Sequence, residues 1–196
     1  VLFGLSCGAF FTAVIGTIAY DLGDGAPLPA SNTTPGVLEL RRLLARARKA
    51  GCTAAVMEVS SHALDQGRTA GLDFRAGAFT NLASDHLDYH QTLDAYFAAK
   101  ARLFAGLAPG ATAVLNRDDP VWPRLAALCR GAVLTYGAAA EADLRYERLV
   151  LAADRTTFRL HVAGQAALDV RTSLVGRHNV SNLLAALGAA LALGVD

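Results

Sequence analysis

The chain has 196 residues, of which 53% are hydrophobic and 18% are charged. This length is enough to bury a core, and we expect one domain. A formal net charge of +1 argues against the broad basic surface of a nucleic-acid-binding protein. The three cysteines, Cys7, Cys52 and Cys129, form no C-x-x-C motif, which is typical of reduced thiols in a cytoplasmic protein.

The first twenty residues are strongly apolar, so a signal peptide or a membrane span has to be considered. No basic segment precedes the apolar run, and Gly4, Gly8 and Gly16 interrupt it. We expect a buried helix end followed by a buried strand at residues 13–20, and no association with a membrane. A membrane segment is the alternative.

A polar loop rich in glycine and proline follows at residues 21–35 and ends in Asn-Thr-Thr-Pro. Thr34 before Pro35 is typical of a helix N-cap with proline at the first helical position. Apolar residues then recur with helical spacing from Val37, and Gly51 is expected to close this helix.

Residues 54–59 form a short apolar run, which predicts a fully buried parallel strand. Glu58 lies at its carboxyl end, and Ser60 and Ser61 can cap the helix that follows. In open α/β sheets, ligands bind at the carboxyl ends of the strands. We therefore expect Glu58 in a site. A surface carboxylate just past the strand is the alternative.

A second apolar strand is predicted at residues 77–82, and an acidic, histidine-bearing segment follows it at 85–90. Aspartate and histidine offer oxygen and nitrogen ligands to a metal, or a histidine held by a carboxylate. This pattern makes His86 a candidate ligand. A solvated polar loop is the alternative.

A third segment places Lys100 among apolar side chains of a predicted helix with Thr92 as its N-cap. The apolar stripe consists of Leu93, Tyr96, Phe97, Leu103, Phe104 and Leu107. A buried lysine has a lowered pKa because its ammonium is desolvated, which leaves a reactive amine. Such an amine can add carbon dioxide and become a carbamate, an oxygen ligand for metal. A lysine that extends its ammonium to water is the alternative.

The remaining elements complete an α/β pattern. Strands are predicted at 111–115 and 132–136, with a helix at 121–129 between them. From Tyr146 to residue 175, apolar and polar residues alternate around turns, which predicts a small antiparallel sheet at the side of the domain. A last helix runs to Leu193. The fold class is thus α/β, a three-layer, mostly parallel sheet flanked by helices with a small antiparallel β subdomain.

The run Met-Glu-Val-Ser-Ser-His-Ala-Leu at 57–64, together with the segments around His86 and Lys100, resembles the central domain of the Mur ligases. The match extends from about residue 12 to 196 and is closest to the E-type, tripeptide-forming branch. The resemblance implies a P-loop NTPase-like fold. It also implies a ligase that uses ATP and Mg²⁺ to add a diamino acid, meso-diaminopimelate or L-lysine, to UDP-MurNAc-L-Ala-D-Glu through an acyl phosphate in peptidoglycan biosynthesis. We expect a cytoplasmic protein and a monomer, although the sequence leaves the oligomeric state open.

The resemblance also implies roles for particular residues. Glu58, His86 and Lys100 as a carbamate would be catalytic and would hold magnesium. The residues implied in binding the UDP-muramoyl-dipeptide are Asn32, Thr33, Thr34, Ser60, Gln66 and Arg68. Near the adenine of ATP, the family pattern Gly-x-x-Asn-x-x-Asn implies Asn182 and its neighbour His178. Helix capping is the structural alternative for Thr34 and for Asn179.

Two departures from the family pattern limit these expectations. No G-x-x-x-x-G-K-[ST] occurs in the 196 residues, so the loop that cradles the phosphates is absent from them. The family's N-terminal UDP-binding and C-terminal amino-acid-binding domains are absent as well. We expect a fragment that begins after the P-loop and is inactive alone.

Three other functions are compatible with the residues. The first is a sister ligase such as folylpolyglutamate or cyanophycin synthetase, against which the Ser-Ser-His-Ala-Leu run argues. The second is a metallohydrolase built on His86, Asp88 and His90, which lacks the further ligands such a site needs. The third is a non-catalytic module that binds the substrate.

Overall fold

The computed structural model describes residues 11–83 and 87–195. The expectations for the N-terminal ten residues, for Cys7 and for His86 lie outside the described residues. Within them, the chain divides into two compact units. The first unit comprises residues 11–72, 87–103 and 195, and the second comprises 73–83 and 104–194. The domain boundaries expected from the sequence stay a prediction.

The first unit contains a four-stranded sheet with the order β3-β2-β1-β4. Its strands are β1 (Thr12–Ile15), β2 (Ala19–Asp21), β3 (Leu28–Pro29) and β4 (Ala54–Met57). β1 pairs with β4 in parallel and with β2 in antiparallel orientation. The single strand predicted at residues 13–20 is wrong, because the chain reverses after Gly16, whose N–H donates to the Ala19 carbonyl at 3.3 Å. The result is two short strands.

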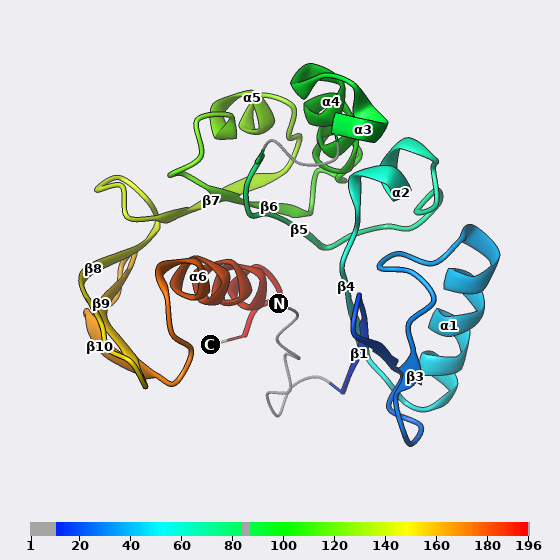
Figure 1. Ribbon diagram of the computed structural model, residues 1–196, viewed down its shortest axis with the longest axis horizontal. Helices are drawn as coiled ribbons and strands as arrows, with labels where there is room; N and C mark the ends of the chain where they lie inside the picture. The colour runs from blue at the N-terminus through cyan, green and yellow to red at the C-terminus, as the bar shows by residue number, and fades with distance from the viewer. Residues whose placement is uncertain (1–10, 84–86, 196) are drawn as a thin grey trace. The chain divides into compact units, whose positions relative to one another are not determined.

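Helix α1 (Val37–Lys49) packs on this sheet, as Figure 1 shows. The core between them consists of Ala13, Ile15, Tyr20, Leu22, Leu40, Leu43 and Ala47. The predicted end of the helix is confirmed, since Ala50 is its C-cap and Gly51 follows. The predicted N-cap is wrong. The helix is preceded by Gly36, which has no side chain to cap it, and the Thr34 hydroxyl bonds elsewhere.

Three further helices belong to this part of the chain: α2 (Ser61–Asp65), α3 (Leu87–His90) and α4 (Leu93–Ala105), of which α4 continues to Leu103 within the first unit. Two predicted caps are confirmed. The Ser60 hydroxyl accepts from the Ala63 N–H at 3.2 Å, and the Thr92 hydroxyl accepts from the Ala95 N–H at 3.1 Å. The full burial predicted for β4 is wrong, because β4 is an edge strand of its sheet and is partly exposed.

The second unit contains a six-stranded sheet with the order β10-β9-β8-β7-β6-β5. Its strands are β5 (Ala76–Phe79), β6 (Thr112–Asn116), β7 (Ala132–Gly137), β8 (Leu144–Leu151), β9 (Thr156–Val162) and β10 (Leu168–Thr172). Neighbours from β5 to β8 are parallel, whereas β8, β9 and β10 are antiparallel. The mixed, mostly parallel sheet is confirmed. The antiparallel strands, however, extend this sheet and do not form a second sheet beside it.

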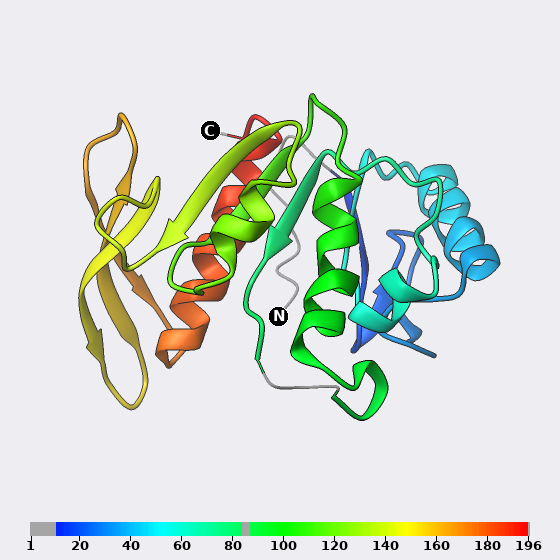
Figure 2. The ribbon, with the colours of Figure 1, turned by 90° about the horizontal axis from the view of Figure 1, so that it is seen from above.

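Helices α5 (Trp122–Ala126) and α6 (Arg177–Ala192) lie on opposite faces of β5–β7, so this unit has three layers (Figures 1 and 2). Under α6 the core consists of Val114, Tyr136, Leu144, Tyr146, Phe158, Leu160, Val180, Leu184 and Ala185. The helix approaches the sheet closely at Gly188, where a Cβ atom would lie 2.6 Å from Val114 Cγ1. Only glycine fits there without a shift of the neighbours.

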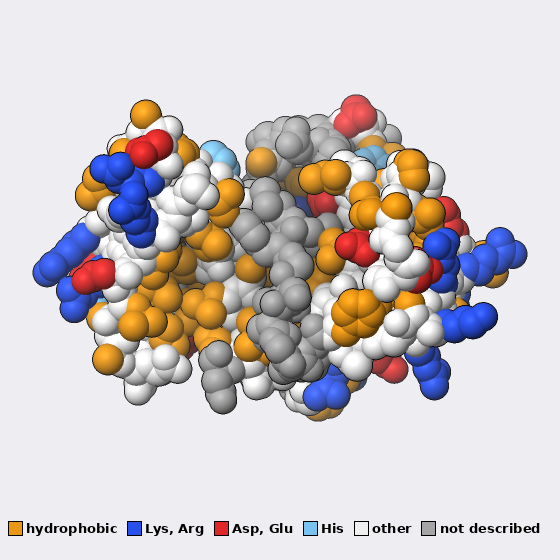
Figure 3. Space-filling view, turned by 90° about the horizontal axis from the view of Figure 1, so that it is seen from below, with side chains coloured by type: hydrophobic (Ala, Val, Ile, Leu, Met, Phe, Trp, Pro, Cys, Tyr) orange, Lys and Arg blue, Asp and Glu red, His pale blue; other side chains and the backbone are white. Residues whose placement is uncertain are grey.

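The antiparallel strands are apolar on the face toward α6 and charged on the other, which confirms the predicted alternation. On the charged face Arg145 lies 3.4 Å from Glu147, and Arg159 lies 3.6 Å from Asp169. Figure 3 shows basic side chains with acidic ones among them at this end of the second unit. Such exposed ion pairs contribute little to stability, so the apolar face holds these strands in place.

Cys52 and Cys129 are free thiols, as expected. Across residues 11–83 and 87–195, the helices are too short or too polar to cross a membrane.

Tyr136 provides a test of the packing under α6. Its side chain is fully buried, and its hydroxyl donates to the Phe79 carbonyl at 3.0 Å. Burial raises the pKa of Tyr136 above its usual range. Near pH 10 the tyrosine of the unfolded chain loses its proton while the folded chain keeps it. The stability that neutral Tyr136 contributes is therefore fully present below about pH 10 and is lost as the pH rises further.

We expect Tyr136→Phe to lower the free energy of unfolding at pH 7 by about 1–2 kcal/mol, because the Phe79 carbonyl loses its partner. Above pH 10 the variant should lose stability less steeply than the unmodified chain. Urea unfolding at a series of pH values measures both effects. An identical alkaline slope in the two proteins would contradict the assignment of Tyr136 as the group responsible.

Candidate functional site

The candidate site begins where β4 ends. The Glu58 N–H donates to the Ile15 carbonyl at 2.9 Å, so the pairing with β1 continues to this residue. The Glu58 side chain is exposed, and its predicted burial is wrong. Its Oε2 accepts from the Thr17 hydroxyl at 2.8 Å, which in turn lies 3.0 Å from the Thr33 hydroxyl. Thr17 was missed by the sequence analysis, because a single threonine in the turn after an apolar strand has no local pattern.

Thr34 connects the loop before α1 to the break between β4 and α2. Its side chain is 1% exposed. The hydroxyl donates to the Glu58 carbonyl at 2.9 Å and accepts from the Ser60 N–H at 2.9 Å. These two bonds occupy the donor and one acceptor position of the hydroxyl, so its role in the structure is to hold the backbone on both sides of Glu58.

Arg68 and Gln66 extend this network from the end of α2. Arg68 Nη1 donates to the Thr34 carbonyl at 2.9 Å, and Arg68 Nε donates to Gln66 Oε1 at 2.8 Å. The Asn32 backbone is fixed on the Tyr20 hydroxyl by bonds of 2.6 and 3.1 Å, while the Asn32 side chain is exposed. Seven of the predicted residues of the first unit therefore lie in one region near the end of β4: Asn32, Thr33, Thr34, Glu58, Ser60, Gln66 and Arg68.

Lys100 lies on α4 of the same unit and is partly buried. Its Nζ is 5.0 Å from the centroid of the Tyr96 ring, a distance at which a cation is attracted to the ring face. The Tyr96 ring stacks on His90 with centroids 5.2 Å apart. Most of the predicted apolar stripe is confirmed by the burial of Tyr96, Phe97, Phe104 and Leu107, but Leu93 is 47% exposed.

His86, the third predicted metal ligand, lies outside the described residues. Asp88 is exposed, and the buried His90 lies 2.9 Å from the Ser61 hydroxyl. Where the structure describes the chain, no group of three His, Cys, Asp or Glu side chains could hold a metal ion. Of the three predicted ligands, Glu58 lies within the described residues and carries a carboxylate, a hard oxygen donor that suits Mg²⁺. The Lys100 side chain would become such a donor only as a carbamate.

The two residues predicted near ATP belong to the second unit. His178 and Asn182 are four residues apart on the first turns of α6 and therefore share a face of this helix. The N-cap of the helix is Gly176, whose φ of +108° is readily adopted only by glycine. Asn179 is not the N-cap, since it lies inside the helix and its Nδ2 donates to the Val175 carbonyl at 2.9 Å. Both candidate residues remain accessible to solvent.

A polar turn at 116–119 has a structural role. Asn116 Nδ2 donates to the Thr80 carbonyl at 2.6 Å, and Asp119 Oδ2 accepts from the Leu82 N–H at 2.8 Å. The Asp118 carboxylate accepts from the N–H groups of two residues that follow β7, 138 and 139. This turn therefore joins the carboxyl ends of β5, β6 and β7, and its acids are occupied by backbone donors.

Residues 4–190 match the family described as the Mur ligase middle domain. Among curated relatives, the UDP-N-acetylmuramoyl-L-alanyl-D-glutamate--2,6-diaminopimelate ligase of Thermosynechococcus vestitus is 46% identical over 186 residues. The enzyme of the same name from Gloeobacter violaceus is 46% identical over 187 residues. Both alignments cover 94% of this chain but only 37% of the relative, so the chain spans little more than a third of these proteins.

Solved structures agree with the sequence relatives. A structure of a UDP-N-acetylmuramoyl-L-alanyl-D-glutamate--2,6-diaminopimelate ligase superposes with a TM-score of 0.78 at 36% identity, covering 94% of this chain and 38% of that one. The MurF ligase of Thermotoga maritima in complex with ADP superposes with a TM-score of 0.66 at 18% identity, covering 83% of this chain and 39% of that one. The second likeness shows the shared fold alone.

We expect the Thr34 hydroxyl to be the main stabilising contact of the site. Thr34→Val keeps the shape of the side chain but leaves the Glu58 carbonyl and the Ser60 N–H without their partner. The free energy of unfolding should fall by about 2–3 kcal/mol. Thr34→Ser keeps the hydroxyl and loses one methyl group, so its cost should be about 1 kcal/mol. Urea unfolding of both variants measures the difference. Equal stability of the valine and serine variants would show that the two bonds do not matter.

Proposed function

Because the chain belongs to the Mur ligase middle-domain family, we propose that it is the central part of an ATP-dependent amide ligase of peptidoglycan biosynthesis. The complete protein joins a diamino acid to UDP-MurNAc-L-Ala-D-Glu. The observation that supports this most directly is the 46% identity to a diaminopimelate ligase. The hydrogen bonds that order the residues around Glu58 are consistent with a substrate site there. We propose meso-diaminopimelate as the diamino acid on the names of these relatives. The predicted cytoplasmic location and monomeric state fit this proposal and stay predictions.

The proposed reaction has two steps. The D-glutamate γ-carboxylate attacks the terminal phosphorus of ATP, which gives an acyl phosphate and ADP. The amine of the diamino acid then attacks the acyl carbon, the C–O bond to phosphate breaks, and the amide forms with release of phosphate and a proton. In such reactions an enzyme acts mainly by positioning the reactants and by neutralising charge.

The first unit supplies groups that suit the muramoyl-dipeptide. The Arg68 guanidinium is held by Thr34 and Gln66 and keeps further N–H donors, which suit a carboxylate. The hydroxyls of Thr17 and Thr33 and the amide of Asn32 offer neutral hydrogen bonds to sugar or peptide groups. In this proposal these residues bind and orient the substrate so that its γ-carboxylate is available for attack.

Glu58, His86 and the carbamate of Lys100 would hold Mg²⁺, which would neutralise charge on the transferred phosphoryl group. Lys100 is partly buried, and its Nζ lies 5.0 Å from the centroid of the Tyr96 ring. In this proposal its amine, once neutral, adds carbon dioxide. His178 and Asn182 would contact the adenine from the first turns of α6, where an asparagine amide can both donate to and accept from a base edge.

The direct test of the function uses the complete protein. ADP and tripeptide formation are measured with UDP-MurNAc-L-Ala-D-Glu and either meso-diaminopimelate or L-lysine. We expect turnover that depends on ATP, magnesium and the diamino acid, with preference for meso-diaminopimelate. Turnover of a folate substrate in place of the muramoyl-dipeptide, or binding of the dipeptide without any turnover, would overturn the proposal.

Lys100 is tested by replacing it with a cation that cannot form a carbamate. We expect Lys100→Arg to lower turnover by about 10²-fold or more, because arginine stays protonated and cannot supply the oxygen ligand. The chain offers a matched control in Lys49→Arg, since Lys49 is its only other lysine and is exposed on α1.

A second measurement on the same variants does not depend on activity. With ¹³C-labelled bicarbonate, the carbonyl NMR signal of a carbamate should appear in the unmodified protein and in Lys49→Arg, and be absent from Lys100→Arg. A signal that survives in the Lys100 variant, or full activity of that variant, would disprove the carbamate.

A further inference from the structure

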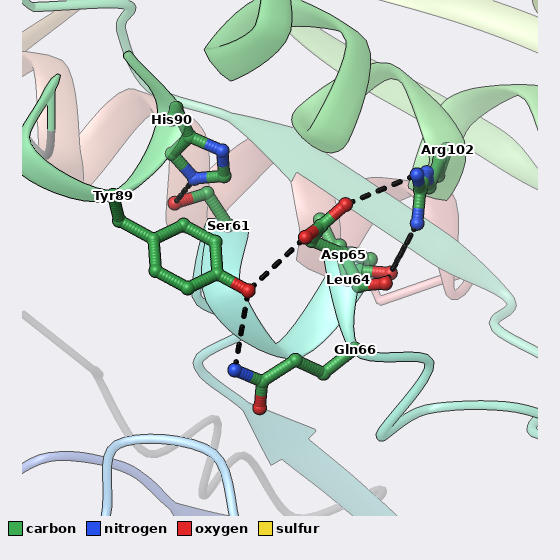
Figure 4. Close-up of polar contacts among 7 residues, drawn as sticks. All are labelled: Ser61, Leu64, Asp65, Gln66, Tyr89, His90 and Arg102. Carbon is green, nitrogen blue, oxygen red and sulfur yellow. Dashed lines mark hydrogen bonds and ion pairs between the residues drawn. The ribbon is translucent and has the colours of Figure 1, made fainter.

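Tyr89 joins the short helix α3 to the end of α2, as Figure 4 shows. Its hydroxyl accepts from Gln66 Nε2 at 3.3 Å and donates to Asp65 Oδ2 at 3.1 Å. A phenol has one donor hydrogen, and the ionised carboxylate can only accept. The hydroxyl hydrogen must therefore point to Asp65, which leaves the oxygen lone pairs for the Gln66 amide.

These bonds fix the orientation of the Gln66 side-chain amide, because both its nitrogen and its oxygen have a partner. Its nitrogen donates to Tyr89, so its oxygen faces the other way and accepts from Arg68 Nε at 2.8 Å. Arg68 Nη1 donates in turn to the Thr34 carbonyl at 2.9 Å. Of the five N–H donors of a guanidinium, these bonds use one on Nε and one on Nη1, so three remain.

The Asp65 carboxylate that orients Tyr89 is itself held. Arg102 Nη2 lies 3.0 Å from Asp65 Oδ1, the oxygen that Tyr89 does not use. Arg102 Nη1 also donates to the carbonyls of Leu64 and Asp65 at 3.3 and 2.8 Å, at the C-terminal end of α2. The contacts of Arg102 thus restrict both the carboxylate and the backbone next to Gln66.

A second anchor keeps α3 in place. The His90 side chain is 7% exposed and lies 2.9 Å from the buried Ser61 hydroxyl, near the start of α2. The ring of the partly exposed Tyr89 also packs on His62 of α2 with centroids 4.1 Å apart, a contact that does not involve the hydroxyl. The Tyr89 hydroxyl, in contrast, bonds only polar side chains, those of Gln66 and Asp65.

We propose that Tyr89 is a positioning residue that aims Arg68 at a carboxylate of the bound substrate. Tyr89 acts through Gln66. Its hydroxyl selects the amide orientation in which the oxygen faces Arg68, and this holds the guanidinium with its free N–H groups directed away from Thr34 and Gln66. The assignment of the ligand as a carboxylate of the muramoyl-dipeptide rests on the proposed function. The ordering of Arg68 does not.

The kinetic test uses Tyr89→Phe in the complete protein. Removing one neutral hydroxyl should raise KM for UDP-MurNAc-L-Ala-D-Glu by roughly three- to tenfold, with kcat and the KM for ATP changed by less than about twofold. The control is Thr135→Val in the second unit, which removes a hydroxyl bonded to Asp143 at 2.7 Å. It should lower stability and leave this KM unchanged. A Tyr89 variant with unchanged KM, or with kcat and all KM values altered together, would overturn the proposal.

A double-mutant cycle separates positioning from simple packing. Gln66→Ala alone should also raise this KM. If Tyr89 acts through Gln66, adding Tyr89→Phe to Gln66→Ala should change KM no further. Fold-changes that multiply in the double variant would show that Tyr89 acts independently of Gln66, which would refute the proposed path.

A measurement without substrate tests the ordering of Arg68 directly. The Nε–H of Arg68, identified in ¹⁵N NMR spectra by its loss in Arg68→Lys, should exchange with water faster in Tyr89→Phe than in the unmodified protein. Faster exchange in a protein without ligase activity would support the positioning and refute the proposed function. Unchanged exchange in an active ligase would refute the positioning alone.

Discussion

The Thr34 hydroxyl is the contact on which the candidate site depends. After the Glu58 N–H, which still pairs with β1, the backbone leaves the ladder before α2 begins, so the Glu58 carbonyl and the Ser60 N–H need other partners. Thr34 supplies one partner to the carbonyl of Glu58 and one to the N–H of Ser60. Because Thr34 is almost fully buried, water cannot replace these bonds, and the chain before α1 is fixed against the chain after β4.

Other contacts of the site involve Thr34 itself or residues next to those that its hydroxyl binds. Arg68 binds the carbonyl of the same threonine, and Glu58 projects from the residue whose carbonyl the threonine holds. The adjacent Thr33 approaches Thr17, which donates to the Glu58 carboxylate. Residues that are far apart in the sequence therefore keep a common orientation because one buried hydroxyl is bonded on two sides.

The sequence predicted what depends on neighbouring residues. The caps by Ser60 and Thr92 were found because each bonds an N–H three residues further on. The strands β4 to β7 were found because each is an apolar run between turns. The Thr34 cap was wrong for the opposite reason: Thr-Pro has the local form of a cap, but the partners of Thr34 are 24 and 26 residues away. Thr17 escaped notice because its partners, Thr33 and Glu58, are 16 and 41 residues away.

The position of a carboxylate at the end of a strand is not enough to identify it as part of a functional site. Asp118 and Asp119 follow β6 as Glu58 follows β4, and a carboxylate after a parallel strand is a reasonable candidate for a site. Both aspartates are occupied by backbone N–H groups, whereas the Glu58 carboxylate accepts from the side-chain hydroxyl of Thr17 and is exposed to solvent. The sequence offered no way to distinguish the two cases, because the donors lie in other strands and loops.

The absence of a side chain at Gly188 sets the distance between α6 and the sheet. A homologue with alanine at this position would have to shrink the opposing side chains, first Val114 and then Leu134 or Leu144. These positions should therefore covary across species. Where they do not, the helix would tilt, and with it the first turns that bear His178 and Asn182, the two residues proposed to contact the adenine.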